Sequence, residues 1–117
     1  MFVDSDTRPV MGNVHNLGLT GESELVRASA GAWLEAVNGK QQFDLILIDP
    51  PWRMSEEVAA GLDRGLPGIL VPGGRVVVES DSKQPLELPS LEAVRERRYG
   101  RTLITFFAHP SSTEQRT

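Results

Sequence analysis

Short apolar runs alternate with stretches of helical periodicity along most of the chain. Apolar or alternating runs predict strands at residues 2–3, 24–28, 45–48, 75–80, 91–98 and 101–108. Apolar positions at helical spacing predict helices at residues 7–17, 30–37 and 55–66. Strands that alternate with helices indicate an α/β fold, and the last two strands predict an antiparallel hairpin across Tyr99-Gly100.

The run from Leu45 to Ile48 contains no polar residue. Such a run is typical of a strand that is buried on both faces in a parallel sheet covered by helices. Val76 to Val78 has the same character. Asp49 follows the first run, so we expect its carboxylate at the carboxyl end of a central strand, where open α/β sheets bind ligands.

Asp49 begins the tetrapeptide Asp49-Pro50-Pro51-Trp52. The two prolines have fixed φ and hold the chain in a stiff extended bend. The Asp49 carboxylate and the Pro50 carbonyl are acceptors that would activate an exocyclic amine of a nucleobase, which is otherwise a poor nucleophile. Trp52 would stack on the base, an interaction of about 1–3 kcal/mol. The alternative is a strand end and a turn, with Trp52 packed on the core.

Other polar residues also follow predicted strands. Asp4 is placed where an acid commonly binds ribose hydroxyls, and Asp6 is predicted to be the N-cap of the following helix. Both acids are equally consistent with turn and capping roles. Ser29 follows the second strand, and Glu79 ends the strand at 75–80, where a solvated strand end explains it at least as well.

Composition narrows the class of protein. The chain of 117 residues allows one small domain, and its lack of cysteine excludes disulfides and thiolate metal sites, so we expect a cytoplasmic protein without a metal. No apolar run approaches the length that spans a bilayer. The net charge of −4 argues against general adhesion to nucleic acid. Four arginines nevertheless cluster near the C-terminus (Arg95, Arg97, Arg98, Arg101). This cluster is either a contact surface for RNA or the solvated edge of a hairpin, and Glu92 and Glu96 dilute its charge.

The tetrapeptide resembles motif IV of methyltransferases that modify exocyclic amino groups. The ordered set of motifs resembles the class I, S-adenosylmethionine-dependent methyltransferases, and among them the small-subunit ribosomal RNA guanine-N2 methyltransferases of the D type (RsmD-like). The matching segments are 3–6, 13–14, 17–19, 32–34, 43–52, 77–80 and 99–100. The resemblance implies a Rossmann-like sheet, mostly parallel, with a C-terminal antiparallel hairpin.

The resemblance also implies roles for individual residues. Asp4 would contact the ribose of S-adenosylmethionine, and Ser29 and Ala30 would lie near its adenine. The catalytic set is Asp49, Pro50, Pro51 and Trp52, which would align the guanine amine with the methyl group; Asp49 would also border the cofactor. The implied partner is ribosomal RNA or the assembling small ribosomal subunit, and we expect a monomer that binds no membrane.

The family's first strand and glycine-rich loop have no counterpart in this sequence. We therefore expect residues 1–110 to be a partial methyltransferase domain that binds the cofactor weakly or not at all, and residues 111–117 to be a polar tail. Two alternatives stay open. One is a DNA adenine-N6 methyltransferase, because the tetrapeptide does not select the base. The other is a non-catalytic RNA-binding remnant that uses the arginine cluster.

Overall fold

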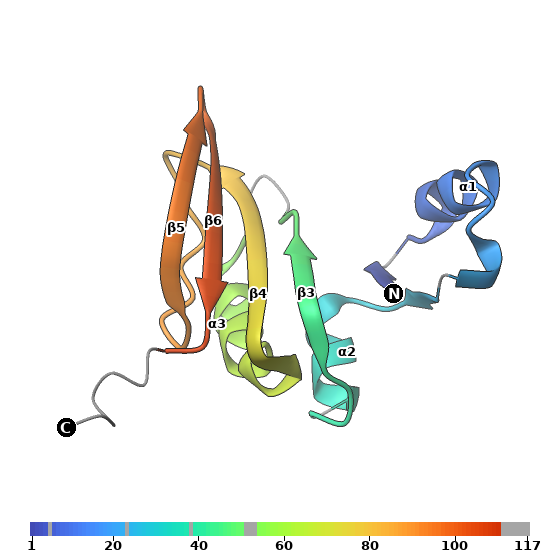
Figure 1. Cartoon of the computed structure of the whole chain (residues 1–117), viewed down its shortest axis with the longest axis horizontal. Helices are drawn as coiled ribbons and strands as arrows, with labels where there is room; N and C mark the ends of the chain where they lie inside the picture. Colours follow the sequence, from blue (N-terminus) through green and yellow to red (C-terminus); the bar gives the residue numbers. More distant parts are fainter. Residues whose placement is uncertain (5, 23, 38, 51–53, 111–117) are drawn as a thin grey trace. The chain divides into compact units, whose positions relative to one another are not determined.

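The computed structural model describes residues 1–4, 6–22, 24–37, 39–50 and 54–110. The chain divides into two compact units, residues 1–37 and residues 38–117, and each is described by itself. Figure 1 shows the elements of both units along the chain. The expected single domain over residues 1–110 stays a prediction, and the expected tail lies outside the described residues.

The described residues of the N-terminal unit form two short parallel strands and two α-helices. Its elements are β1 (Phe2–Asp4), α1 (Arg8–Asn16), the 3-10 turn η1 (Thr20–Glu22), β2 (Leu25–Arg27) and α2 (Ala30–Val37). Phe2 lies opposite Leu25, and Asp4 lies opposite Arg27. The predicted strands and helices of this unit are therefore confirmed, with a shorter second strand than expected.

The helix ends in this unit follow local sequence signals. Pro9 lies in the first turn of α1, and Gly18 follows the helix with φ of 71°, a conformation that glycine adopts without strain. The prediction that Asp6 is the N-cap was wrong, because Thr7 occupies that position. The Asp6 carboxylate instead accepts from the Arg8 amide at 3.1 Å and forms an ion pair with the Arg8 guanidinium at 2.9 Å.

The second unit contains a four-stranded sheet and one α-helix within the described residues. Its elements are β3 (Phe43–Ile48), α3 (Glu56–Gly65), the 3-10 turn η2 (Pro67–Ile69), β4 (Leu70–Asp81), β5 (Glu92–Tyr99) and β6 (Thr102–Ala108). The strand order is β3-β4-β6-β5; β3 is parallel to β4, and the other two pairs are antiparallel. The predicted hairpin is thus confirmed, and the sheet of this unit is mixed.

The core of the second unit lies on one face of the sheet. Val76 and Val78 of β4 are fully buried there, together with Phe107 of β6. Figure 1 shows α3 behind the sheet, and its Leu62 and the following Leu66 are buried. Val58 of the same helix does not belong to this core, since it is 48% exposed.

The prediction that Leu45–Ile48 is buried on both faces was also wrong. Leu45 and Leu47 are 58% and 73% exposed. Side chains alternate across a strand, so Ile46 and Ile48 lie on the α3 face and the two leucines on the other. Among the strands that the structure describes in this unit, β3 pairs only with β4 and so forms one end of the sheet order.

The segment Pro72-Gly73-Gly74 has the composition of a turn, but it lies within β4. Gly73 has φ of 83°, and the register between β3 and β4 shifts at this point. The first part of β4 therefore bends, but β4 remains paired with β3 on both sides of the bend. No helix within the described ranges is long and apolar enough to cross a membrane.

Candidate active site

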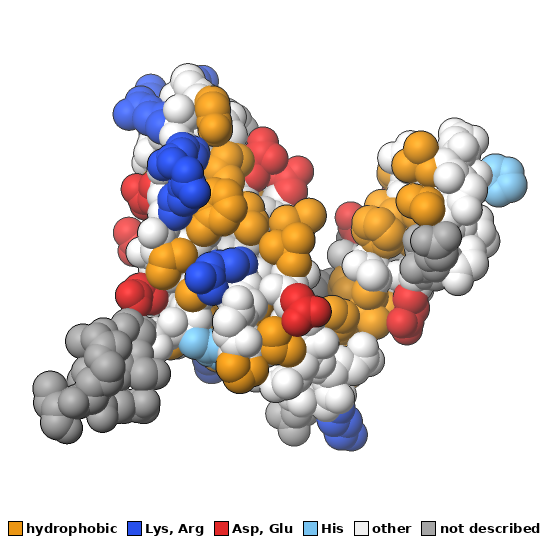
Figure 2. Space-filling model, viewed as in Figure 1, with side chains coloured by type: hydrophobic (Ala, Val, Ile, Leu, Met, Phe, Trp, Pro, Cys, Tyr) orange, Lys and Arg blue, Asp and Glu red, His pale blue; other side chains and the backbone are white. Residues whose placement is uncertain are grey.

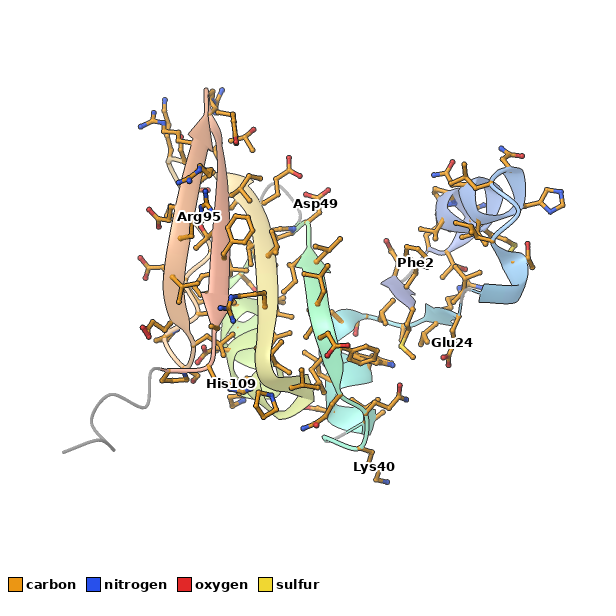
Figure 3. All side chains as sticks on the ribbon, in the orientation of Figure 1. Phe2, Glu24, Lys40, Asp49, Arg95 and His109 are labelled. Atoms are coloured by element: carbon orange, nitrogen blue, oxygen red, sulfur yellow. The ribbon has the colours of Figure 1, made fainter. Side chains whose placement is uncertain are left out.

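Asp49 directly follows the last residue of β3, as predicted, although β3 stands at one end of the described strand order of its unit and is not central there. Ile48 of β3 is the register partner of Val78 of β4, and Glu79 follows Val78. Because β3 and β4 are parallel, Asp49 and Glu79 lie at the same edge of the sheet. Figure 3 shows Asp49 at the carboxyl end of β3.

A cleft of about 1050 Å³ opens at this edge of the sheet. It is bordered by the end of β3, one side of α3, the end of β4 with the following loop, and the start of β6. The residues that line it are Asp49, Pro50, Met54, Ser55, Glu56, Ala59, Ala60, Asp63, Arg64, Glu79, Ser80, Asp81, Gln84, Pro85, Leu86, Glu87, Pro89, Arg101 and Thr102. Its volume suits a ligand of the size of a nucleotide.

The cleft is acidic. Six carboxylates line it against the two guanidiniums of Arg64 and Arg101 (Asp49, Glu56, Asp63, Glu79, Asp81, Glu87). Asp81 is held by the Lys83 backbone amide at 2.9 Å and by the Arg101 guanidinium at 3.1 Å. The amide hydrogen bond, followed by the attraction to Arg101, holds the pKa of Asp81 below its ordinary value of 3.8. An acidic cleft with low-dielectric walls favours a cationic ligand.

Two side chains outside the predicted set shape the walls of the cleft. Ser55 is the N-cap of α3, with its hydroxyl accepting from the Val58 amide at 3.2 Å. Asp63 of α3 accepts from the backbone amide of Ser90 at 2.8 Å and from its hydroxyl at 2.6 Å. These bonds tie α3 to the loop before β5. No local sequence signal indicates the pair of Asp63 and Ser90, since the residues are far apart in the chain.

Asp49 differs from these acids in having a free carboxylate. Asp63 and Asp81 both accept hydrogen bonds that hold backbone in place. Asp49 is exposed, and it makes no hydrogen bond or ion pair with any residue that the structure describes. Its oxygens are therefore available to a ligand in the cleft. Pro50 also lines the cleft, whereas Pro51 and Trp52 of the predicted set lie outside the described residues.

The three predicted cofactor contacts of the N-terminal unit come together at one edge of its sheet. Asp4 ends β1, and its backbone carbonyl accepts from the Ala28 amide at 2.9 Å, just before Ser29 and Ala30. The Asp4 carboxylate accepts from the Asp6 amide at 3.0 Å. The Ser29 hydroxyl accepts from the Ala32 amide at 3.2 Å, at the start of α2. The turn and capping roles are thus observed, and the cofactor contacts stay predictions.

Among the residues with described positions, no three histidine, aspartate or glutamate side chains are grouped so as to hold a metal ion.

The match of this sequence to a known protein family shows which family the chain belongs to. Residues 1–108 match the family described as Conserved hypothetical protein 95. The chain belongs to this family. Comparison with curated proteins found no match.

Solved structures share the fold of this family member. A hypothetical protein from Thermus thermophilus aligns with a TM-score of 0.72 and 22% identity over 92% of this chain. The "putative methyltransferase yhhF" from Escherichia coli aligns with a TM-score of 0.65 and 20% identity over 93% of this chain. The chain spans 60% and 61% of the lengths of these two proteins.

A third structure contains a ligand. SMU.776, described as a "putative methyltransferase complexed with SAH", aligns with a TM-score of 0.67 and 14% identity over 91% of this chain and 38% of its own. These likenesses show that the family member has an α/β fold of the methyltransferase type.

Proposed function

We propose that this chain is an S-adenosylmethionine-dependent N-methyltransferase that acts on an exocyclic amine of guanine in small-subunit ribosomal RNA. The observation that carries the proposal is the position of Asp49 and Pro50. They follow a strand of a methyltransferase-type fold and border an acidic cleft, and the Asp49 carboxylate has no partner among the described residues.

The residues of the cleft fit a cationic methyl donor. S-adenosylmethionine supplies an electrophilic methyl group on a positively charged sulfur. The carboxylates of Glu79 and Asp81 line the same cleft as Asp49, so the walls favour positive charge over negative charge. The complex of SMU.776 with SAH, the demethylated product, supports this class of ligand. In the N-terminal unit, Asp4, Ser29 and Ala30 are the proposed contacts to ribose and adenine.

Asp49 and Pro50 have the chemistry that an exocyclic amine requires. The amine has two N–H groups, and its lone pair is delocalised into the ring. A carboxylate that accepts from one N–H group and a backbone carbonyl that accepts from the other stabilise the positive charge that develops on the nitrogen. Asp49 then takes up the proton that the methylated amine releases. Pro51 and Trp52 complete the proposed set, with the indole ring stacked on the base.

The test is methyl transfer by the 117-residue chain at millimolar S-adenosylmethionine, which offsets weak cofactor binding. Under-methylated small ribosomal subunits and duplex DNA serve as acceptors, and the methylated nucleosides are identified by mass spectrometry. We expect N2-methylguanine from ribosomal RNA. N6-methyladenine from DNA alone would contradict the substrate, and no transfer to either acceptor would contradict the activity.

Two variants assign the role of Asp49. Asp49→Asn keeps the size of the side chain but removes its charge and its capacity to accept a proton, so we expect transfer to fall by about 10²-fold or more. Asp44→Asn is the matched control, because Asp44 is an exposed acid near the opposite end of β3. An equal loss in both variants would remove Asp49 from the mechanism.

A further inference from the structure

One face of the sheet in the second unit carries no helix of that unit within the described residues. The pairing register assigns side chains to this face, which we call the open face, because register partners share a side of a sheet. α3 lies on the other side (Figure 1). The open face consists of Leu45 and Leu47 from β3, Arg75, Val77, Glu79 and Asp81 from β4, Thr102, Ile104, Phe106 and Ala108 from β6, and Glu92, Arg95, Arg97 and Tyr99 from β5.

The register separates the charges of β5. Arg95 lies opposite Phe106, and Arg97 lies opposite Ile104, both on the open face. Glu96 lies opposite Thr105, which is buried on the α3 side. Of the two acids that dilute the arginine cluster in the linear sequence, Glu96 therefore points away from Arg95 and Arg97, whereas Glu92, opposite Ala108, lies on the open face. The open face of β5 is basic between Arg95 and Tyr99.

The two arginines of β5 on the open face form no ion pair with a carboxylate in the described part of the chain. Arg95 is exposed and has no hydrogen bond or ion pair there. Arg97 is exposed and donates to the backbone carbonyl of Glu96 at 3.1 Å. Figure 3 shows Arg95 projecting from β5 on the side of the sheet away from α3. Both guanidiniums can therefore pair with an external anion.

Aromatic and apolar side chains lie beside these cations. Tyr99 is 66% exposed and follows Arg95 and Arg97 on the same side of β5. Phe106 is half-buried in the neighbouring strand, directly across from Arg95. Figure 2 shows Lys and Arg side chains bordering a hydrophobic area on this side of the sheet. Exposed rings with flanking guanidiniums are the chemistry that binds unpaired nucleotides by stacking and phosphate contacts.

The open face leads to the cleft. Thr102, the register partner of Tyr99, lines the cleft, and so does Glu79, which lies beside Ile104 in the sheet. A strand of nucleic acid on β5 and β6 would thus end at the cleft that Asp49 borders.

We propose that the open face is a binding site for single-stranded RNA next to the target base. Arg95 and Arg97 bind phosphates, and Tyr99 and Phe106 stack on bases. The proposal rests on the proposed function for its choice of RNA. A flat sheet with exposed rings selects unpaired nucleotides, because bases in a duplex already stack on one another.

Fluorescence anisotropy with the full chain tests the proposal. The probe is a fluorescein-labelled single-stranded RNA of about 12 nucleotides, which fits the site sizes of single-strand-binding proteins, with the same sequence as a duplex for comparison. We expect the single strand to bind at least ten-fold more tightly. Arg97→Gln should weaken its binding several-fold, whereas Arg98→Gln should change it less than two-fold, because Arg98 lies opposite Leu103 on the other side of the same strand. The two variants differ by one position and carry the same charge change.

Two further variants separate stacking from charge. Arg95→Gln combined with Arg97→Gln should lower the salt dependence of log K by about 1.4, since each phosphate contact to a single strand contributes about 0.7. Tyr99→Ala should weaken binding five-fold or more without changing the salt dependence. Thermal unfolding of each variant, followed by circular dichroism, confirms that it is folded.

Several outcomes would overturn the proposal. They are equal losses in Arg97→Gln and Arg98→Gln, equal affinity for single and double strands, and absence of binding at low salt. A dimer in sedimentation that Leu47→Glu dissociates, with no RNA bound, would assign the open face to a second copy. Methyl transfer measured in parallel keeps the two proposals apart. Transfer that neither arginine variant changes contradicts only the open face, and RNA binding without transfer contradicts only the activity.

Discussion

At the scale of single residues, the carboxylates of this chain divide by what they already bind. Asp6, Asp63 and Asp81 accept from nearby backbone amides and so stabilise local structure. Asp49 has no such bond with a described residue, although it lines the same cleft as Asp63 and Asp81. An exposed carboxylate that makes no bond within the fold stays hydrated, so it does not destabilise the folded state and remains available to a ligand. Glu56, Glu79 and Glu87 of the cleft also lack such a bond with a described residue, so Asp49 is the candidate for catalysis because it ends β3 directly before Pro50.

Asp81 predicts a pH dependence of stability. Its pKa lies below the ordinary 3.8 because the Lys83 amide and then Arg101 stabilise the carboxylate. The folded state therefore binds the proton more weakly than the unfolded chain, and the contribution of Asp81 is fully present above 3.8 and disappears as pH falls through the lower folded value. The midpoint of thermal unfolding should thus drop on acidification, and less so in Asp81→Asn.

Arg101→Gln is the companion variant for this measurement. It removes the ion pair at 3.1 Å and leaves the hydrogen bond from the Lys83 amide. The acid dependence that Asp81 causes should therefore become smaller without vanishing. An Asp81→Asn protein with the same acid dependence as the original chain would contradict the assignment.

At the scale of elements, β4 organises the second unit because it pairs with both β3 and β6. Its first half approaches the backbone of β3 closely. A Cβ atom on Gly74 would lie 2.7 Å from Leu70 Cδ1 and 3.0 Å from the Asp44 and Val71 carbonyl oxygens. The two carbonyls belong to the paired backbone, so they cannot move away without disturbing the register of β3 and β4.

We therefore expect Gly74→Ala to lower the free energy of unfolding by about 1–3 kcal/mol. Urea denaturation followed by circular dichroism measures the change. Gly61→Ala is the control within the same unit, because a Cβ there meets only the Arg64 guanidinium, at 3.9 Å. Gly61 lies inside α3, so alanine should stabilise it by about 1 kcal/mol. A Gly74→Ala protein as stable as the original would show that β4 shifts freely.

At the scale of the whole molecule, the two units differ in how much sheet they contain. The described part of the N-terminal unit has only the three-residue strands β1 and β2, whereas the second unit has four longer strands with a core under α3. A two-stranded sheet is marginally stable in water. Amide hydrogen exchange should therefore be faster in Phe2–Asp4 and Leu25–Arg27 than in β4 and β6. Mass spectrometry of peptide fragments measures this, and equal protection of both units would refute it.

Most elements could be predicted from the sequence because their signals are local. Ser55 with Glu56 and Glu57 marks the start of α3, and the spacing around Gly100 marks the hairpin of β5 and β6. The burial of β3 could not be predicted in this way. An apolar run such as Leu45–Ile48 shows that the strand can be buried on two sides, but only its neighbours decide whether it is.

The candidate site likewise contains residues that local sequence predicts and residues that only the tertiary structure brings together. The sequence predicts Asp49 and Pro50, since an acid and a proline that end an apolar run belong at the edge of a sheet whatever the other elements do. It does not predict Asp63, which binds Ser90 across 27 positions, nor the separation of Glu96 from Arg95 and Arg97. Those relations depend on which strands pair and in which register. Local chemistry along the chain determines which groups can react or bind, and only the pairing of distant segments decides which of them face the same ligand.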